Sequence, residues 1–396
     1  MDGGKSEDKK GMKVRALYLL LLLAILVAGA GLWRAMRVHE TATASTRTFL
    51  ASWSPEAAAS YLDYREDWWQ SWPPAQKDHG TICISCHTVV PYALVRPTLQ
   101  QASGHTEMPA AEKTMLSSVE KRVSQWPKMT PFYSDTADGP GKTVESHATE
   151  AVLNAVILAS EDDWQGHLRP ITRTALDEAW ALQERSGEKA GGWRWQDFDL
   201  APWESAESGY QGAAMLAIAL GGAPDHYAVD PDASKHLDLL QDYLRRGYRS
   251  QPLMSQVYVL WASGRMPRLL DEAGRTKLLA EIRKLQHDDG GWALSSLDKP
   301  KIWKRLEIPS ASDGCATGLV VLALEEAGMS RHDKMLARGV EWLEQHQLKD
   351  GRWLASSLNE SRDPNSEIGR FMSDAATAYA ALALEMAQRN GGGSVH

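Results

Sequence analysis

The chain has 396 residues, of which 43% are hydrophobic and 24% are charged, and its formal net charge is −8 at pH 7. This length is sufficient for two or three globular domains, and the acidic balance without a basic stripe excludes nucleic acid as an expected partner. The sequence has 16 Trp and only 4 Phe, a ratio that the repeats described below explain.

The N-terminus combines basic residues with one long apolar run. Residues 16–33 (ALYLLLLLAILVAGAGLW) carry no charge and have about the minimum length for a transmembrane helix. More Lys and Arg precede this run than follow it, so we expect residues 1–15 to form a cytoplasmic tail and the rest to be exported. Cleavage as a signal peptide at Ala28-Gly29-Ala30 is the alternative. The expected location is the inner membrane, single-pass, with most of the chain in the periplasm.

The next feature is the motif Cys83-Ile84-Ser85-Cys86-His87. Residues 34–60, rich in Thr, Ala and Ser, are expected to form a stalk that leads to it. Two thiols separated by two residues can add to the vinyl groups of a haem, and the histidine that follows can ligate the iron. We therefore expect one covalently bound haem c, attached through Cys83 and Cys86 and with His87 as an axial ligand. Export agrees with this, because c-type haem is attached outside the bacterial cytoplasm.

Two other interpretations of the cysteine pair are weaker. A thioredoxin-like redox pair belongs in a βαβ context, which this sequence lacks. A zinc site needs a second pair of ligands at suitable spacing, and Cys315 is the only further cysteine.

Residues 61–127 form the expected haem domain. The apolar spacing in residues 112–126 predicts an amphipathic helix at its end. A short domain of this kind resembles the small c-type cytochromes, and the resemblance implies that a Met-Pro pair before the last helix supplies the second axial ligand. Met108-Pro109 matches that pair, although the spacing from His87 is short. The alternatives are Met115, Met129, His105 and a five-coordinate iron.

The sequence repeats itself from residue 143 onward. Residues 128–142 are dense in Pro, Gly and Asp and predict a linker, and residues 391–396 a disordered tail. In residues 279–328 and 338–387, an amphipathic helix, a Gln, a turn ending in Trp and an Ala/Leu-rich helix follow one another. Alternation of a polar-faced helix with an apolar one predicts two concentric helical layers.

Gln347, Gly351 and Trp353 match the QW motif of triterpene cyclases, and Gln286 and Trp292 match its second half. Residues 143–390 thus resemble the α/α toroid of squalene-hopene cyclases and protein prenyltransferases. We expect the Gln amides to join neighbouring helix ends and the Trp rings to stack over the turns. The predicted fold is mainly α: an N-terminal transmembrane helix, a small c-type cytochrome domain and a C-terminal toroid.

The resemblance implies two kinds of chemistry that the residues do not support. Cyclases use a DxDD acid, which is missing, and prenyltransferases bind zinc through a D-x-C segment and a histidine. Asp313-Gly314-Cys315 matches the D-x-C segment, but Ala376 stands at the histidine position. We expect Asp313 to cap its helix and Cys315 to be buried. The inner helix starts are expected to bring together at one mouth Glu145, His147, Glu207, Tyr210, Asp313 and Asp374.

The expected function is electron transfer by a membrane-anchored, exported monohaem cytochrome, with the toroid as a ligand- or partner-binding module. The expected partner is a redox protein or a quinone-linked donor, and an apolar ligand is possible. One alternative is a haem-dependent oxidoreductase or a terpenoid- or lipid-processing enzyme that uses the toroid cavity. The other alternative is a purely structural toroid.

Overall fold

The computed structural model describes residues 48–225, 227–298 and 309–392. The chain divides into two compact units, residues 1–48 and residues 49–396, and the second contains nearly all of the described residues. The predicted anchor at residues 16–33 lies outside them. Within the described ranges, no helix is long and apolar enough to cross a bilayer.

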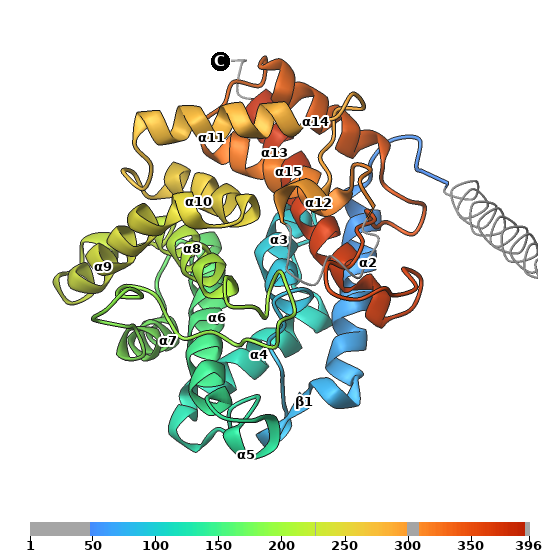
Figure 1. The fold of residues 1–396 in the computed structure, drawn as a ribbon. Helices are drawn as coiled ribbons and strands as arrows, with labels where there is room; N and C mark the ends of the chain where they lie inside the picture. The colour runs from blue at the N-terminus through green and yellow to red at the C-terminus, as the bar shows by residue number, and fades with distance from the viewer. Residues whose placement is uncertain (1–47, 226, 299–308, 393–396) are drawn as a thin grey trace, which may run out of the picture. The chain divides into compact units, whose positions relative to one another are not determined.

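The second unit is built around a closed ring of inner helices (Figure 1). Each inner helix packs on the next one along the chain, and the last packs on the first. Two of them, α8 and α13, are buried on every face, which explains why their sequences are apolar all round. In ring order the inner helices are α3 (Val89–Ala102), α6 (Lys142–Gln165), α8 (Ser208–Gly221), α10 (Leu253–Arg265), α13 (Gly314–Glu326) and α15 (Phe371–Gly392).

An outer layer of amphipathic helices surrounds this ring. Helix α14 is typical, because it buries only one face, which includes Leu336, Trp342 and Leu343. In chain order the outer helices are α2 (Pro55–Ser71), α4 (Ala110–Ser124), α7 (Pro170–Ala181), α9 (Pro231–Gly247), α11 (Glu272–Leu285) and α14 (Lys334–Gln345). Outer and inner helices alternate along the chain, as the sequence repeats predict. The shorter elements are an antiparallel pair, β1 (Gln76–Lys77) and β2 (Thr81–Ile82), and the helices α5 (Asp135–Asp138) and α12 (Leu294–Leu297).

The QW turns join neighbouring outer helices, as expected. The Gln286 amide donates to the Gly290 carbonyl of its own turn and to the Met335 carbonyl of α14, each at 2.8 Å. The Trp292 indole donates to the Ile282 carbonyl at 2.8 Å and so holds the turn against α11. The weaker copy repeats this arrangement, because Gln183 donates to Gly191 and to His236 of α9.

The last QW turn closes the outer layer. Gln347 donates to the Gly351 carbonyl at 2.9 Å and to the Ser54 carbonyl at 3.0 Å, and its side-chain oxygen accepts the Ser54 N–H at 2.6 Å. Gly351 has φ +92°, and a Cβ there would lie 2.0 Å from the Ala57 carbonyl oxygen of α2. Helix α2 therefore occupies the place of the next outer helix after α14.

This closure corrects the expected domain organisation. Residues 61–127 do not form a separate body, because α2 and α3 are the hairpin that completes the toroid. Helix α3 buries its apolar residues between α6 and α15, and the stalk becomes helical at Pro55, where α2 begins. The expected linker packs against the ring as well: Met129 is buried, and the Phe132 ring lies under the Arg122 guanidinium.

Candidate functional site

The motif Cys83–His87 lies at the mouth of the toroid where the inner helices begin. A cavity of about 230 Å³ opens there between the starts of α3, α6 and α15. Residues 196–204 and 359–371, from the loops before α8 and α15, cover it. Cys83, Cys86 and His87 all line this cavity, which we call the motif cavity.

Local hydrogen bonds fix the motif in place. The Cys83 N–H donates to the Ala75 carbonyl at 2.7 Å, and the Trp69 indole donates to the Cys83 carbonyl at 2.8 Å. Ser85, between the two cysteines, accepts the backbone N–H groups of Thr88 and Val89 at 3.3 and 3.1 Å. Ser85 thus satisfies free N–H groups at the start of α3, and the motif becomes the N-terminal cap of an inner helix.

One nitrogen of the His87 ring is bound to the protein. His87 Nδ1 lies 2.8 Å from Thr88 Oγ1, which donates to Asp374 Oδ2 at 2.8 Å. Iron- and zinc-binding histidines commonly have their second ring nitrogen held by such a partner, which fixes the ring orientation. This arrangement leaves Nε2 of His87 as the nitrogen that can ligate a metal.

Asp374 is the centre of a buried polar network that joins the last inner helix, α15, to the outer helix α2 and to the start of α3. Its Oδ1 accepts the Tyr61 hydroxyl and the Arg65 Nε–H, both at 2.8 Å. Arg65 has no exposed surface, and Asp374 is 1% exposed. Burial raises the pKa of Asp374, and Arg65, Tyr61 and Thr88 all oppose that rise. The network holds α15 against α2 and, through Thr88, sets the His87 ring.

Aromatic rings surround the imidazole. Phe371 stacks on His87 with ring centroids 3.9 Å apart, and Trp69 meets it edge-on at 5.1 Å. Trp203 approaches at 5.7 Å from the loop before α8. Burial among these rings lowers the pKa of His87 to about 3, so the imidazole is neutral and able to act as a ligand.

The two cysteines are free and half-buried. Burial raises the pKa of Cys83 to about 12 and raises that of Cys86 well above its ordinary value. Redox-active CxxC pairs have lowered thiol pKa values, so this site does not suit thioredoxin-like exchange. Among the described residues, no group of three or more His, Cys, Asp or Glu side chains is placed to hold a metal ion.

The motif cavity also contains a polar group without a partner. Gln196 is 3% exposed, lines the cavity, and its Nε2 has no hydrogen-bond acceptor. Burial raises the pKa of the neighbouring Glu204 to about 7, and Arg362 is the cation among the lining residues. A carboxylate-bearing, flat aromatic group would suit these side chains. A porphyrin is larger than the space, so its entry requires the covering loops to move.

The structure does not bring Met108 to this cavity. Met108 is half-buried in the loop before α4, and it is absent from the residues that line the motif cavity. The alternatives do not line the motif cavity either: Met115 and Met129 are buried elsewhere, and His105 is exposed. His87 is the only Met or His side chain among the lining residues.

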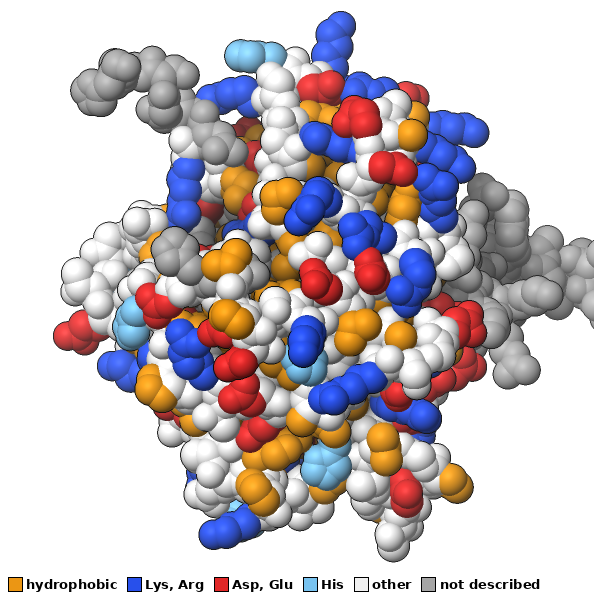
Figure 2. All heavy atoms as spheres, turned by 90° about the vertical axis from the view of Figure 1, so that its left-hand side faces the viewer, with side chains coloured by type: hydrophobic (Ala, Val, Ile, Leu, Met, Phe, Trp, Pro, Cys, Tyr) orange, Lys and Arg blue, Asp and Glu red, His pale blue; other side chains and the backbone are white. Residues whose placement is uncertain are grey.

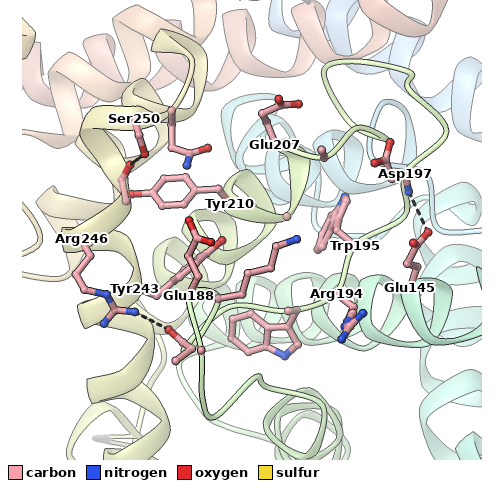
Figure 3. A pocket seen from close by; sticks show the side chains of 18 residues that line it. Glu145, Glu188, Arg194, Trp195, Asp197, Glu207, Tyr210, Tyr243, Arg246 and Ser250 are labelled. Carbon is pink, nitrogen blue, oxygen red and sulfur yellow. Dashed lines mark hydrogen bonds between the residues drawn. The ribbon is translucent and has the colours of Figure 1, made fainter. Parts of the chain in front are cut away.

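The six residues expected at one mouth separate into several places. Glu145, Glu207 and Tyr210 do line one pocket, of about 660 Å³, beside the loop that follows α7 (Figure 3). Glu145 pairs with Lys142 at 2.7 Å and accepts the Asp197 N–H at 3.3 Å. His147 packs edge-on against Trp126, while Asp374 belongs to the His87 network.

Asp313 is an N-cap, as expected. One of its carboxylate oxygens accepts the backbone N–H groups of Cys315 and Ala316, both at 3.0 Å, and the other accepts that of Leu294 at 2.5 Å. Cys315 is fully buried. The D-x-C segment therefore serves the helix start and the loop beside it.

On the face of the molecule shown in Figure 2, Lys and Arg side chains lie among Asp and Glu side chains over most of the surface.

One comparison with known proteins, the match to a family model, supports the toroid. Residues 270–365, from the start of α11 to the loop after α14, match the family model of the squalene-hopene cyclase C-terminal domain. The chain is mainly helical and contains a terpenoid-cyclase-like α/α toroid. Among solved structures, it is similar to a polysaccharide lyase, with a TM-score of 0.39, 13% identity, and coverage of 88% of this chain and 93% of that one. No curated protein matches the chain.

Proposed function

We propose that this chain is an exported c-type haem protein in which the haem is attached inside the mouth of an α/α toroid. Cys83 and Cys86 are the attachment points, and His87 Nε2 is the proximal ligand. The observation that carries the proposal is the bond from His87 Nδ1 through Thr88 to Asp374, because it gives the imidazole the fixed orientation of a metal ligand.

The other residues of the motif cavity suit the same group. Trp69, Trp203 and Phe371 supply flat apolar walls. Arg362, which pairs with Glu360 at 2.6 Å, is the lining cation that a haem carboxylate would meet. Gln196 offers an unused N–H donor. When bound, the haem supplies one-electron chemistry, and the protein sets its potential through the axial ligand, the burial and these hydrogen bonds.

We propose that residues 16–33 anchor the chain in the inner membrane and that residues 49–396 lie in the periplasm. The redox partner would then be a periplasmic protein or a quinone-linked donor. The motif cavity has no Met and no second His among its lining residues. This favours a haem-dependent oxidoreductase, with one iron position open to a small molecule, as the second candidate beside a pure electron carrier.

Covalent attachment can be tested directly. The full-length chain would be exported from a host that carries a c-type haem maturation system, and its intact mass and haem staining on a denaturing gel would be measured. We expect the mass of one haem and a stained band. The double variant Cys83→Ser, Cys86→Ser should lose both, whereas Cys315→Ser, the same change at the third cysteine, should keep both. An unstained wild-type band at the apoprotein mass, from a host that matures a control cytochrome, would disprove the proposal.

A further inference from the structure

A single hydrogen bond joins the two segments that cover the motif cavity. The first segment is residues 196–204, from the loop before α8, and the second is residues 359–371, from the loop before α15. Each places several side chains in the cavity wall. Among the described residues, the one hydrogen bond or ion pair between the two segments runs from the Asn359 side-chain N–H to the Ala201 carbonyl, at 2.8 Å.

The Asn359 amide is oriented so that its N–H faces Ala201. Its Oδ1 accepts the Ser357 hydroxyl at 3.0 Å and an Arg362 N–H at 3.1 Å. A guanidinium group can only donate, so the amide oxygen has to face Arg362. The amide nitrogen is thereby directed away from these donors and toward the carbonyl of the other segment.

The tip of the first segment, residues 199–201, depends on Asn359 for its attachment to the rest of the chain. Its other hydrogen bonds go to Asp197 and Glu204 of the same segment, at 2.8 to 3.0 Å. These bonds persist when the segment moves as a unit. Within the described part of the chain, the Asn359 amide is the one hydrogen-bond partner of the tip outside residues 196–204.

We propose that residues 199–201 are the movable tip of a lid over the motif cavity, and that the bond between Asn359 and Ala201 holds this lid closed. When the bond breaks, the tip leaves the cavity, and the half-buried thiols of Cys83 and Cys86 become accessible to solvent. This opening would give the haem its way in. That role in haem entry rests on the proposed function, whereas the lid itself does not.

Alkylation of thiols in the full-length, reduced apoprotein tests the lid without haem. The reagent is iodoacetamide, used at concentrations at which the rate stays proportional to the reagent, so that the rate follows the population of the open state. Peptide mass spectrometry locates the label on the two motif cysteines, Cys83 and Cys86. The third cysteine, Cys315, is fully buried in α13 and reports unfolding of the whole ring.

Asn359→Asp tests the closing bond, because it keeps a side-chain oxygen for Arg362 and removes the N–H that donates to Ala201. It should speed alkylation of the two motif cysteines about two- to tenfold, the range that one net hydrogen bond provides. Asn365→Asp is the same change elsewhere in the second segment, at a side chain that only accepts, from Arg352 at 2.8 Å. It should leave both rates at the wild-type value.

A measurement on the wild type keeps the proposal testable if Asn359→Asp unfolds. Alkylation is repeated at urea concentrations below the unfolding transition. A local opening exposes little surface, so the rates of the motif cysteines should hardly depend on urea, whereas that of Cys315 should rise steeply. Motif cysteines whose rates rise as steeply as that of Cys315 would overturn the proposal. Equal rates in the wild type and a folded Asn359→Asp would overturn it too, as would equal acceleration by Asn365→Asp. An apoprotein mass in the haem-attachment experiment, by contrast, would refute the proposed function alone.

Discussion

The starts of α13 and α15 carry nearly the same sequence and do different things. In α13, Asp313 stands four residues before Thr317, and in α15, Asp374 stands three residues before Thr377. The two threonines are equivalent, since each accepts the backbone N–H of a QW tryptophan. Asp313 therefore corresponds to Ser373, which also bonds to the preceding loop, and Asp374 stands one position further into its helix.

That single-residue offset changes what the carboxylate contacts. Asp313 bonds to backbone N–H groups of its own helix and the loop beside it, whereas Asp374 accepts from the side chains of Tyr61, Arg65 and Thr88. In α13 the corresponding position is Gly314, where a Cβ would lie 2.4 Å from the Trp353 Cβ. The same helix start thus serves as a cap in one repeat and, in the next, holds the motif that carries the proposed haem ligand.

The largest effect is expected from breaking the Asp374 network. Asp374→Ala removes the buried carboxylate that pairs with Arg65 and accepts the Tyr61 and Thr88 hydroxyls, and it leaves Arg65 with the part-exposed Glu367 as its acid partner. This should lower the free energy of unfolding by about 3–5 kcal/mol. Urea denaturation followed by circular dichroism measures this. The double variant Arg65→Met, Asp374→Leu should recover part of the loss, because it removes both charges. A loss below about 1 kcal/mol in Asp374→Ala would mean that the pair is not buried.

The ring closure can be compared with an ordinary QW turn. Gln347→Ala removes the bonds to Ser54 and Gly351 in a site that is 1% exposed, and it should cost about 1–3 kcal/mol. Gln286→Ala at the half-buried turn before α14 is the matched control and should cost less. Only Gln347→Ala should expose α2 to limited proteolysis. Equal cleavage of α2 in both variants would contradict closure through Ser54.

The first hairpin also contains a buried acid whose titration is measurable. Burial raises the pKa of Glu66 from 4.5 to about 8 in the folded chain. The folded state therefore favours the protonated form of Glu66. The stability that this protonated carboxyl group contributes is complete below pH 4.5 and is lost as the pH rises through about 8. Glu66→Gln imitates the protonated acid, and its stability relative to the wild type should increase across this interval, by up to about 1.4 kcal/mol for each unit of pKa shift. A constant difference between the two proteins from pH 4.5 to 8 would refute the raised pKa.

The smallest effect is expected at the cap. Asp313→Ala should lower the free energy of unfolding by about 0.5–2 kcal/mol, because it removes the carboxylate that accepts the first N–H groups of α13. Asp313→Asn keeps an acceptor oxygen and should restore most of the loss in the same urea denaturation experiment. A cost as large as that of Asp374→Ala would remove the distinction between the two helix starts.

The sequence predicts the repeats that carry a Gln, a turn and a Trp, because these residues make local bonds with fixed spacing. It does not reveal that α2 and α3 form the same kind of hairpin, since the motif Cys83–His87 replaces the QW turn between them. The density of Pro and Gly in residues 128–142 then suggests a domain boundary that the packing of Met129 and Phe132 does not support.

In the candidate site, too, the residues that are adjacent in sequence can be predicted, whereas the distant residue that contacts them cannot. Cys83, Cys86 and His87 are adjacent and recognisable, but the partner that sets His87 through Thr88 is Asp374, which is separated from Thr88 by 286 positions. The available signal is the pair Tyr61 and Arg65, one turn apart in α2 and both buried, because a buried Arg needs an acid partner. Sequence spacing alone does not say which acid that is.

Native-state hydrogen exchange tests the central claim that the haem-attachment motif belongs to the toroid. In a single closed ring, the amides of α3 should be protected with the same free energy of opening as those of α13 and α15, since α3 packs between α6 and α15. Exchange of α2, α3 and α4 at a clearly lower free energy, while α6 to α15 stay protected, would contradict the account and restore a separate N-terminal domain.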